Sequence, residues 1–384
     1  MKPIRQRFNR VLASAAFTAG VMLSGLTCAA EPGVTDGEIV IGQVAPLTGV
    51  LSGPNRENVE GALAYLKFIN KHGGIHGRKI TLKQFDDEQN AQKALDITKK
   101  LIAERSVFAF AMHRTSPTLE KVVPEATQAG FPVIAPQVGP TFVYEPINPL
   151  VFNVRARYRE EVAKIIEYLH TTGSDGFGFL YADDAFGRDN MVGAKEAMEK
   201  LKLKPVAEVL LDNRTTDIGP AVQVFAKARP QAIVVITNAK AAAEFVKMMR
   251  KSGVDSLFVS LSNTSGDGYI KDLGEAGNGV IVTQVMPYPF SDATPIAREF
   301  RKLMKENSTT APSYASIQGF ISAKLLVEGL KRAGPKPTQK GFAQALESMG
   351  NFDFGGYMIS YGPNKRDGSQ YVDITMIKNG KFLR

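Results

Sequence analysis

Short runs of β-branched and other apolar residues alternate with longer amphipathic segments along this chain from residue 38 onward. The first run, residues 39–44, predicts a buried strand, and residues 58–70 predict a helix that ends at the Gly73-Gly74 turn. The alternation continues with predicted strands at 80–85, 107–111 and 132–135 and predicted helices at 90–103 and 116–129. Such a β-α-β-α series predicts a parallel sheet with helices on both faces.

The same series then begins again, which predicts a second lobe built like the first. Residues 153–169 carry the apolar stripe of a helix and start this lobe, and predicted strands follow at 176–181, 206–211, 232–236 and 257–260. Corresponding strands of the two series start at Val107 and Ala232, which are 125 residues apart, and near Val133 and Leu257, which are 124 apart. This constant offset predicts two similar α/β lobes.

Residues beyond 283 do not start a third copy. Residues 296–305 and 314–333 predict helices, and residues 355–382 predict β-hairpins. These pieces are too few to bury a core alone, so we expect them to complete the two lobes. The first lobe would comprise residues 31–154 plus 285–350, and the second residues 155–284 plus 351–384. The chain would then cross between the lobes on more than one strand, which is how a hinge is built.

The first 30 residues predict a secretory signal. Four basic residues at the start are followed by an uncharged apolar run, residues 11–27, and by small residues that end at Ala30. We therefore expect an exported, periplasmic protein cleaved near Ala30. The run is short for a membrane span, which needs roughly 20 residues, so an uncleaved anchor is the weaker alternative. Lipid attachment at Cys28 is another alternative, but the Gly25-Leu26-Thr27 lead-in fits it poorly.

Removing this segment changes the composition. The formal net charge of +9 contains four positive charges from the first 30 residues, and the remaining charges of both signs are interspersed. The basic balance therefore gives little support to nucleic-acid binding. Cys28 is the only cysteine in the sequence, so disulfides, thiolate catalysis and cysteine-ligated metals are excluded once it is removed.

Patterns for catalysis and for metal or cofactor binding are missing from the sequence. It contains no P-loop, Gly-x-Ser-x-Gly elbow, Ser-x-x-Lys or His-Glu-x-x-His pattern. His72 and His76 have the i, i+4 spacing of a metal pair, but two glycines between them favour a turn. The acidic clusters 86–88 and 183–184 could act in acid–base chemistry or bind a cation, although capping of the next helix is the more common role. We expect neither an enzyme nor a cofactor or metal site.

Residues that follow the strand at 107–111 are suited to binding an anion. Arg114, Thr115 and Ser116 lie beyond the carboxyl end of this strand, where ligands bind in open α/β sheets. Pro117 suits the first helical position, so Ser116 is expected to be the N-cap. The free N–H groups and the dipole of a helix N-terminus favour an anion such as a carboxylate.

Several segments, taken in their order along the chain, resemble the periplasmic branched-chain amino acid binding proteins, the leucine/isoleucine/valine-type receptors of ABC transporters. They are residues 44–49 (VAPLTG), 61–62, 69–78 (INKHGGIHGR), 86–87, 181–187 (YADDAFG) and 279–283. The resemblance covers almost the whole chain after residue 30. It implies a type I periplasmic-binding-protein fold: two doubly wound α/β lobes, three crossing strands and one ligand in the cleft between them.

The resemblance also implies ligand contacts. Ser116 matches the serine whose hydroxyl and neighbouring amides hold the ligand carboxylate, and Phe186 matches an aromatic residue that closes over the ligand. Gln137, Val138 and Gly139 match a loop that gives further contacts, with Gly139 replacing a frequent threonine.

Two further departures concern the second lobe. Asn238 stands where another aromatic residue is usual, and Ser262 stands where amino-acid receptors carry an acid for the ligand ammonium. A neutral residue there removes a charge-assisted hydrogen bond of about 1.5–3 kcal/mol. Either Asp183 or Asp184 replaces that acid, or the ligand lacks an ammonium group.

The expected function is a monomeric extracytoplasmic receptor that captures a carboxylate-bearing solute by hinge closure and delivers it to a separate membrane permease. Branched-chain or other hydrophobic amino acids are the leading solutes on grounds of resemblance. Aromatic or aliphatic carboxylates and small amides are the alternatives that Ser262 leaves open. A periplasmic enzyme is the weakest alternative.

Overall fold

The computed structural model describes residues 31–212 and 217–384. The expected secretory signal, its cleavage point and Cys28 lie outside the described residues. No helix within the described ranges is both long and apolar enough to cross a membrane.

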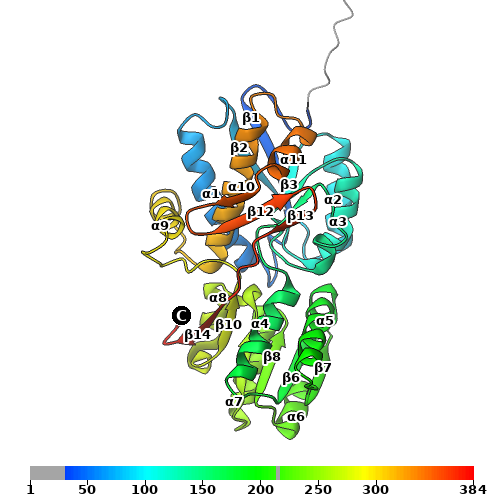
Figure 1. The fold of residues 1–384 in the computed structure, drawn as a ribbon, viewed down its shortest axis with the longest axis vertical. Helices are drawn as coiled ribbons and strands as arrows, with labels where there is room; N and C mark the ends of the chain where they lie inside the picture. Colours follow the sequence, from blue (N-terminus) through cyan, green and yellow to red (C-terminus); the bar gives the residue numbers. More distant parts are fainter. Residues whose placement is uncertain (1–30, 213–216) are drawn as a thin grey trace, which may run out of the picture. The chain divides into compact units, whose positions relative to one another are not determined.

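A parallel five-stranded sheet forms the centre of the first lobe (Figure 1). Its strand order is β2-β1-β3-β4-β5, and every neighbouring pair is parallel. The strands are β1 (Glu38–Ala45), β2 (Lys79–Asp86), β3 (Ala109–Ala111), β4 (Val133–Ile134) and β5 (Val151–Phe152). The helices packed with it are α1 (Ser52–Lys71), α2 (Ala91–Ala103), α3 (Ser116–Gln128), α9 (Pro295–Asn307), α10 (Tyr314–Ala333) and α11 (Gln339–Glu347).

A seven-stranded sheet forms the centre of the second lobe, in the order β15-β14-β10-β9-β8-β6-β7. Its parallel part repeats the strand order of the first lobe, which confirms the predicted duplication. The strands are β6 (Phe177–Ala182), β7 (Ala207–Leu211), β8 (Ala232–Ile236), β9 (Leu257–Ser260), β10 (Ile281–Gln284), β14 (Asp373–Lys378) and β15 (Lys381–Leu383). The helices are α4 (Tyr158–Thr171), α5 (Ala185–Lys200), α6 (Gly219–Ala228), α7 (Ala239–Lys251) and α8 (Asp267–Leu273).

Alternate residues of each central strand enter different hydrophobic clusters, because successive side chains of a strand point to opposite faces. In β1, Ile39 and Ile41 pack in the cluster that holds α1 and α10, whereas Val40 and Val44 pack with α2 and α3. Strands buried on both faces read as continuous apolar runs, which is why the sequence pattern located them.

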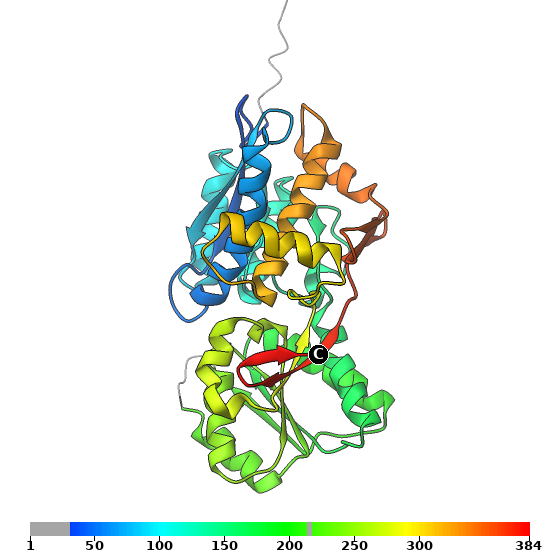
Figure 2. The same ribbon diagram turned by 90° about the vertical axis from the view of Figure 1, so that its left-hand side faces the viewer.

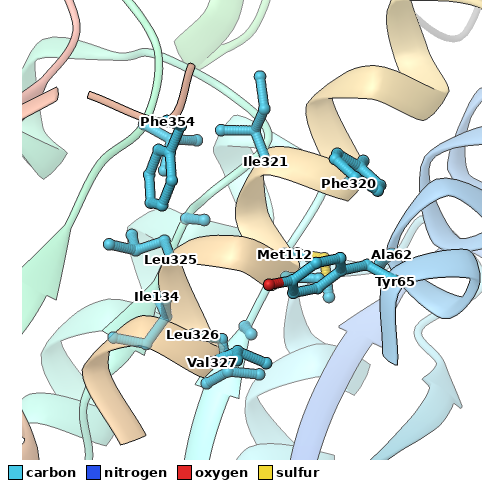
Figure 3. Close-up of a cluster of buried hydrophobic side chains, with 14 of the residues drawn as sticks. Ala62, Tyr65, Met112, Ile134, Phe320, Ile321, Leu325, Leu326, Val327 and Phe354 are labelled. Carbon is cyan, nitrogen blue, oxygen red and sulfur yellow. The ribbon is translucent and has the colours of Figure 1, made fainter. Parts of the chain in front are cut away.

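The closest helix pair of the first lobe is α1 with α10. A Cβ added at Gly61 would lie 1.8 Å from the Ser316 carbonyl oxygen, and one added at Gly319 would lie 1.8 Å from that of Asn58. The two glycines therefore allow the backbones to approach closely. Around them, Tyr65 of α1 and Phe320 of α10 pack edge to face, with ring centroids 5.2 Å apart (Figure 3).

Replacing Gly319 with alanine should reduce the free energy of unfolding by about 1–3 kcal/mol, because the added methyl group overpacks this contact. Guanidinium unfolding measures the change. Gly268→Ala in α8 is the matched control, since a Cβ there meets nothing within 4 Å. Equal stability of the two variants would contradict the close approach of α1 and α10.

The end of the chain is divided between the lobes differently from the expectation. The strands β11 (Asn351–Asp353), β12 (Met358–Gly362) and β13 (Lys365–Gly368) form a separate sheet that contacts α11 and β5 of the first lobe (Figure 1). Strand β12 and the residues between β11 and β12 contribute four aromatic or aliphatic side chains to the first-lobe core: Phe354, Tyr357, Ile359 and Tyr361. Assigning all of residues 351–384 to the second lobe was therefore wrong, because only β14 and β15 pair with its sheet through β10.

The chain passes between the two sheets three times: from β5 to α4, from β10 to α9 and from β13 to β14. After the second crossing, α9 lies against α1 (Figure 2). The Tyr357 hydroxyl lies 2.7 Å from the Val154 carbonyl oxygen of the first crossing and 3.1 Å from that of Val285 in the second. This side chain therefore holds two crossings together.

Candidate functional site

A cavity of about 360 Å³ lies beyond the carboxyl ends of strands from both sheets. The first lobe lines it with the start of α1, the start of α3, the loop after β4, and α10. The second lobe lines it with the loops after β6, β8 and β9. Its lining residues are Val50, Leu51, Pro54, Gln89, Arg114, Thr115, Ser116, Pro117, Gln137, Val138, Arg155, Tyr158, Ala182, Asp184, Phe186, Asn238, Ala239, Ser262, Asn263 and Gln318.

Nine of the ten predicted site residues lie in this lining, and Gly139 does not. Its carbonyl oxygen accepts a hydrogen bond from Tyr158 N at 2.8 Å. A Cβ at position 139 would lie 2.8 Å from the Ala156 carbonyl oxygen and 3.2 Å from Arg155 Nε. A threonine cannot fit here, because the first crossing occupies the space that its side chain would need.

The N-cap of α3 is Thr115, not Ser116. Thr115 has extended backbone angles, φ −108° and ψ 145°, and its hydroxyl accepts from Thr118 N at 3.2 Å. The predicted capping role of Ser116 was therefore wrong, because Ser116 is already the first helical residue. Its Oγ is buried in the first turn and has no hydrogen-bond partner within 3.5 Å among residues 31–212 and 217–384, although the Tyr158 hydroxyl is near enough to interact with it.

Ser116 and the start of α3 thus present an unsatisfied hydroxyl and helix N-terminal amides to the cavity. Ser116 is only 2% exposed, and a buried polar group without a partner is costly. Burial raises the pKa of the nearby Tyr158 phenol to about 12, so this group stays a neutral hydroxyl donor at neutral pH. Together these groups suit a carboxylate.

Arg155, Glu161 and Ser262 form a buried polar cluster, here called the Arg155 cluster. Arg155 is 2% exposed and Glu161 is fully buried; they form an ion pair with 3.1 Å between Nη2 and Oε2. The same Nη2 donates to Ser262 Oγ at 3.1 Å, and Nη1 donates to the Gln137 carbonyl oxygen at 3.1 Å. Arg155 therefore connects the β4 loop of the first lobe to α4 and the β9 loop of the second.

Arg114 brings a second guanidinium group to the cavity. No hydrogen bond or ion pair within 4.0 Å links its side chain to any other of the described residues. Burial lowers its pKa, and the positive charge of Arg155 lowers it further, but an arginine remains charged at neutral pH.

The second-lobe residues of the cavity stand at helix N-termini. Asp184 caps α5 by accepting from Gly187 N at 2.9 Å, and Asn238 caps α7 by accepting from Ala241 N at 3.0 Å. Phe186 packs edge to face on Tyr158, with ring centroids 4.9 Å apart. Asp183 forms an ion pair with Arg188 and does not line the cavity, so of the two adjacent acids only Asp184 faces the cavity.

The sequence analysis did not single out Arg155, Tyr158, Asn263 or Gln318. Arg155 and Tyr158 fell within the helix predicted for residues 153–169, whereas α4 begins only at Tyr158 and Arg155 lies in the first crossing. Gln318 belongs to α10, which the sequence analysis assigned to the first lobe without indicating which of its faces would line the cavity.

The other polar clusters have structural roles. Asp86 accepts from the backbone N–H groups of Leu47 and Glu88, each at 2.9 Å, whereas α2 is capped by Asn90. The expected capping of α2 by the 86–88 cluster was therefore wrong, because this cluster braces the loop that precedes α1. His72 and His76 lie in turns, and each ring contacts a backbone carbonyl.

Glu57 of α1 reaches the start of α8 in the second lobe. Its carboxylate accepts from Ser313 Oγ at 2.8 Å, and a Cβ added at Gly266 would lie 3.1 Å from Glu57 Oε1. Burial is the largest effect on the Glu57 pKa and raises it; the negative charge of Asp267 raises it further, against the lowering effects of the Ser313 hydrogen bond and of Arg114.

Replacing Glu57 with glutamine should flatten the pH dependence of stability above pH 4.5. Because its pKa is raised in the folded state, the folded protein binds more protons than the unfolded chain in this window. The free energy of unfolding of the unmodified protein therefore falls as the pH rises through the raised pKa. Urea unfolding between pH 4.5 and 7.5 measures this slope, and an unchanged slope in Glu57→Gln would contradict the assignment.

Two α/β lobes with one strand order, joined by three crossings around one cavity, define the type I periplasmic-binding-protein fold. The family model described as "Periplasmic binding protein" matches residues 38–381. The chain belongs to this family, whose members are solute-binding proteins that bind small molecules and work with ABC-transporter permeases. The fold class predicted from the sequence is thereby confirmed.

Individual relatives agree with the resemblance seen in the sequence motifs. The chain is 22% identical over 381 residues to the Leu/Ile/Val-binding protein homolog 3 of Brucella melitensis, covering 97% of this chain and 98% of the relative. A possible leucine/isoleucine/valine-binding protein from Rhodopirellula baltica SH 1 superposes with a TM-score of 0.85 at 23% identity, covering 91% and 97% of the two chains. An R. palustris ABC-transporter solute-binding protein in complex with benzoate superposes with a TM-score of 0.81 at 19% identity, covering 90% and 95%.

Proposed function

We propose that this protein is an extracytoplasmic receptor of an ABC importer, in which the cavity between the lobes holds a small carboxylate-bearing solute. The observation that carries the proposal is the Ser116 hydroxyl at the start of α3, which has no hydrogen-bond partner within 3.5 Å among the described residues and lines the same cavity as Arg114. Both face a cavity that the two lobes build together.

Capture would occur in two steps. The solute carboxylate first binds to the first lobe at Ser116, and the second lobe then contributes Phe186, Asn238 and Ser262. A ligand favours closure only through contacts that are stronger in the closed arrangement, so these second-lobe contacts set the closing equilibrium. A dissociation constant in the micromolar range, about −8 kcal/mol, is sufficient for delivery to a permease.

Two solute classes are supported by different observations. The names of the relatives from Brucella and Rhodopirellula favour a branched-chain or other hydrophobic amino acid. Ser262, in place of an acid, favours a carboxylate without an ammonium group. We expect the solute to leave chemically unchanged in either case, because no base within the described part of the chain is hydrogen-bonded to the Ser116 hydroxyl to activate it.

Calorimetric titration and small-angle X-ray scattering test the proposal together. A panel of hydrophobic amino acids and organic acids should include at least one solute that binds with micromolar affinity and reduces the radius of gyration. Chromatography of the recovered solute should show the starting compound. A rigid particle that binds none of the panel, or a solute converted to another compound, would contradict the proposed function.

A further inference from the structure

An amino-acid ammonium group would need a hydrogen-bond acceptor in the second lobe. The buried carboxylate beside Ser262, that of Glu161, is already occupied by other donors. The Glu161 carboxylate accepts hydrogen bonds from Ser262 N at 3.0 Å, Ser262 Oγ at 2.6 Å and Arg155 Nη2 at 3.1 Å. These three donors fill most of its acceptor positions. The positive charge of Arg155 also balances its negative charge, so the Arg155 cluster presents no net negative charge to the solute.

Ser262 itself is a poor partner for an ammonium group. Its hydroxyl proton is donated to Glu161, and its oxygen already accepts from Arg155. An ammonium group placed at Ser262 would therefore lie beside a guanidinium group of the same charge. In the low-dielectric interior, such a pair costs more than it would in water.

Arg114 adds positive charge on the first-lobe side of the cavity. The acid that acts on it most directly is Glu57, whose carboxylate is directed to Ser313 and the start of α8. Since no ion pair within 4.0 Å compensates Arg114 among the described residues, an anionic group of the solute is its natural partner.

Asp184 is the one acid among the described residues that line the cavity. Its carboxylate caps α5, where the helix dipole and the Gly187 N–H stabilise the negative charge. Arg155 is already balanced by Glu161, so Asp184 and Arg114 are the remaining charged groups of the described lining. Asp184 is engaged as a helix cap, whereas Arg114 has no ion pair within 4.0 Å among the described residues, which favours an anionic group on the solute over an ammonium group.

We infer that the solute is an organic acid that lacks an ammonium group, with its carboxylate at Ser116 and Arg114 and an apolar body beside Leu51 and Phe186. This inference rests on the receptor function proposed above and narrows its solute class. Apolar 2-oxo acids and simple carboxylic acids meet these requirements.

Matched pairs of solutes test this inference in calorimetry. Leucine is compared with 4-methyl-2-oxopentanoate, and phenylalanine with 3-phenylpropanoate, because each pair keeps the carboxylate and the side chain but differs at the ammonium group. The acid should bind at least tenfold more tightly than the amino acid. Equal or tighter binding of the amino acid would overturn this inference and leave the receptor function standing. Failure of all four compounds to bind or to compact the protein would overturn both.

Variants identify the groups that cause the preference. Arg114→Gln should weaken acid binding at least tenfold and affect the amino acid less, whereas Arg56→Gln, an equal charge change at an exposed position of α1, should leave both affinities unchanged. Asp184→Asn should strengthen acid binding, because it removes a negative charge from the cavity lining. An unchanged acid affinity in Arg114→Gln would overturn the inference. So would an amino acid that binds the unmodified protein as tightly as the matched acid and no longer binds Asp184→Asn. Thermal unfolding confirms that each variant is folded.

Discussion

Replacing Arg155 with leucine is expected to lower the free energy of unfolding by about 3–5 kcal/mol, because it leaves a buried carboxylate without its compensating charge. Glu161 is fully buried, and Arg155 is its ion-pair partner at 3.1 Å. The variant also loses the hydrogen bond to the Gln137 carbonyl oxygen. Guanidinium unfolding of the unmodified and variant proteins measures the difference.

The double variant Arg155→Leu, Glu161→Leu distinguishes the loss of the ion pair from the cost of leaving an isolated charge buried. It should recover part of the lost stability, since a buried ion pair replaced by apolar groups is often close to neutral. Arg188→Leu is the surface control: its ion pair with Asp183 is largely exposed and should contribute less than about 1 kcal/mol. A loss for Arg155→Leu no larger than for Arg188→Leu would contradict the role of the Arg155 cluster.

Replacing Ser116 with alanine is expected to weaken solute binding by about 1.5–3 kcal/mol, the range for a hydrogen bond to a charged group. This corresponds to roughly a tenfold to 150-fold increase in the dissociation constant. Stability of the free protein should change little, because the hydroxyl makes no hydrogen bond within 3.5 Å to any residue that the structure describes. Calorimetry gives the affinity and thermal unfolding gives the stability.

Two comparison variants show whether the change in affinity is specific to the Ser116 hydroxyl. Ser348→Ala, at an exposed position after α11, should change neither quantity. Thr115→Ala removes the cap of α3 and should lower stability by about 1 kcal/mol, which Ser116→Ala should not do. An affinity for the proposed solute that is unchanged in Ser116→Ala would remove Ser116 from the site.

The parallel strands and most of the helices could be predicted because their side chains repeat with a regular period. Strands β8 and β9 and helix α10 have the predicted bounds. In contrast, α1 begins six residues before the predicted start, because its first two turns carry the polar residues Asn55 and Asn58. Both are buried against other polar groups, and neither contributes to an apolar stripe.

The candidate site was predictable where it depends on the ends of strands. Ser116, Asn238 and Ser262 follow β3, β8 and β9, so the order of elements alone brings them to one edge. The Arg155 cluster was not predictable in this way. Glu161 is six residues from Arg155 and Ser262 is 107 residues away, and neither spacing places side chains together on one helix or strand.

The same limit explains the error in the lobe boundary. The prediction of β-hairpins within residues 355–382 was correct, but it contains no information about which core a hairpin joins. The burial of Tyr357 and Tyr361 against the first-lobe core decides that question.

Three crossings of the chain have a consequence for the order of assembly. The first lobe needs the aromatic side chains around β12, and the sheet of the second needs β14, so neither core is encoded by one continuous stretch of sequence. A nascent polypeptide cannot finish either half until nearly all of its residues have been synthesised. Any premature stop before residue 354 should therefore yield two incomplete halves and not one intact lobe with a missing neighbour.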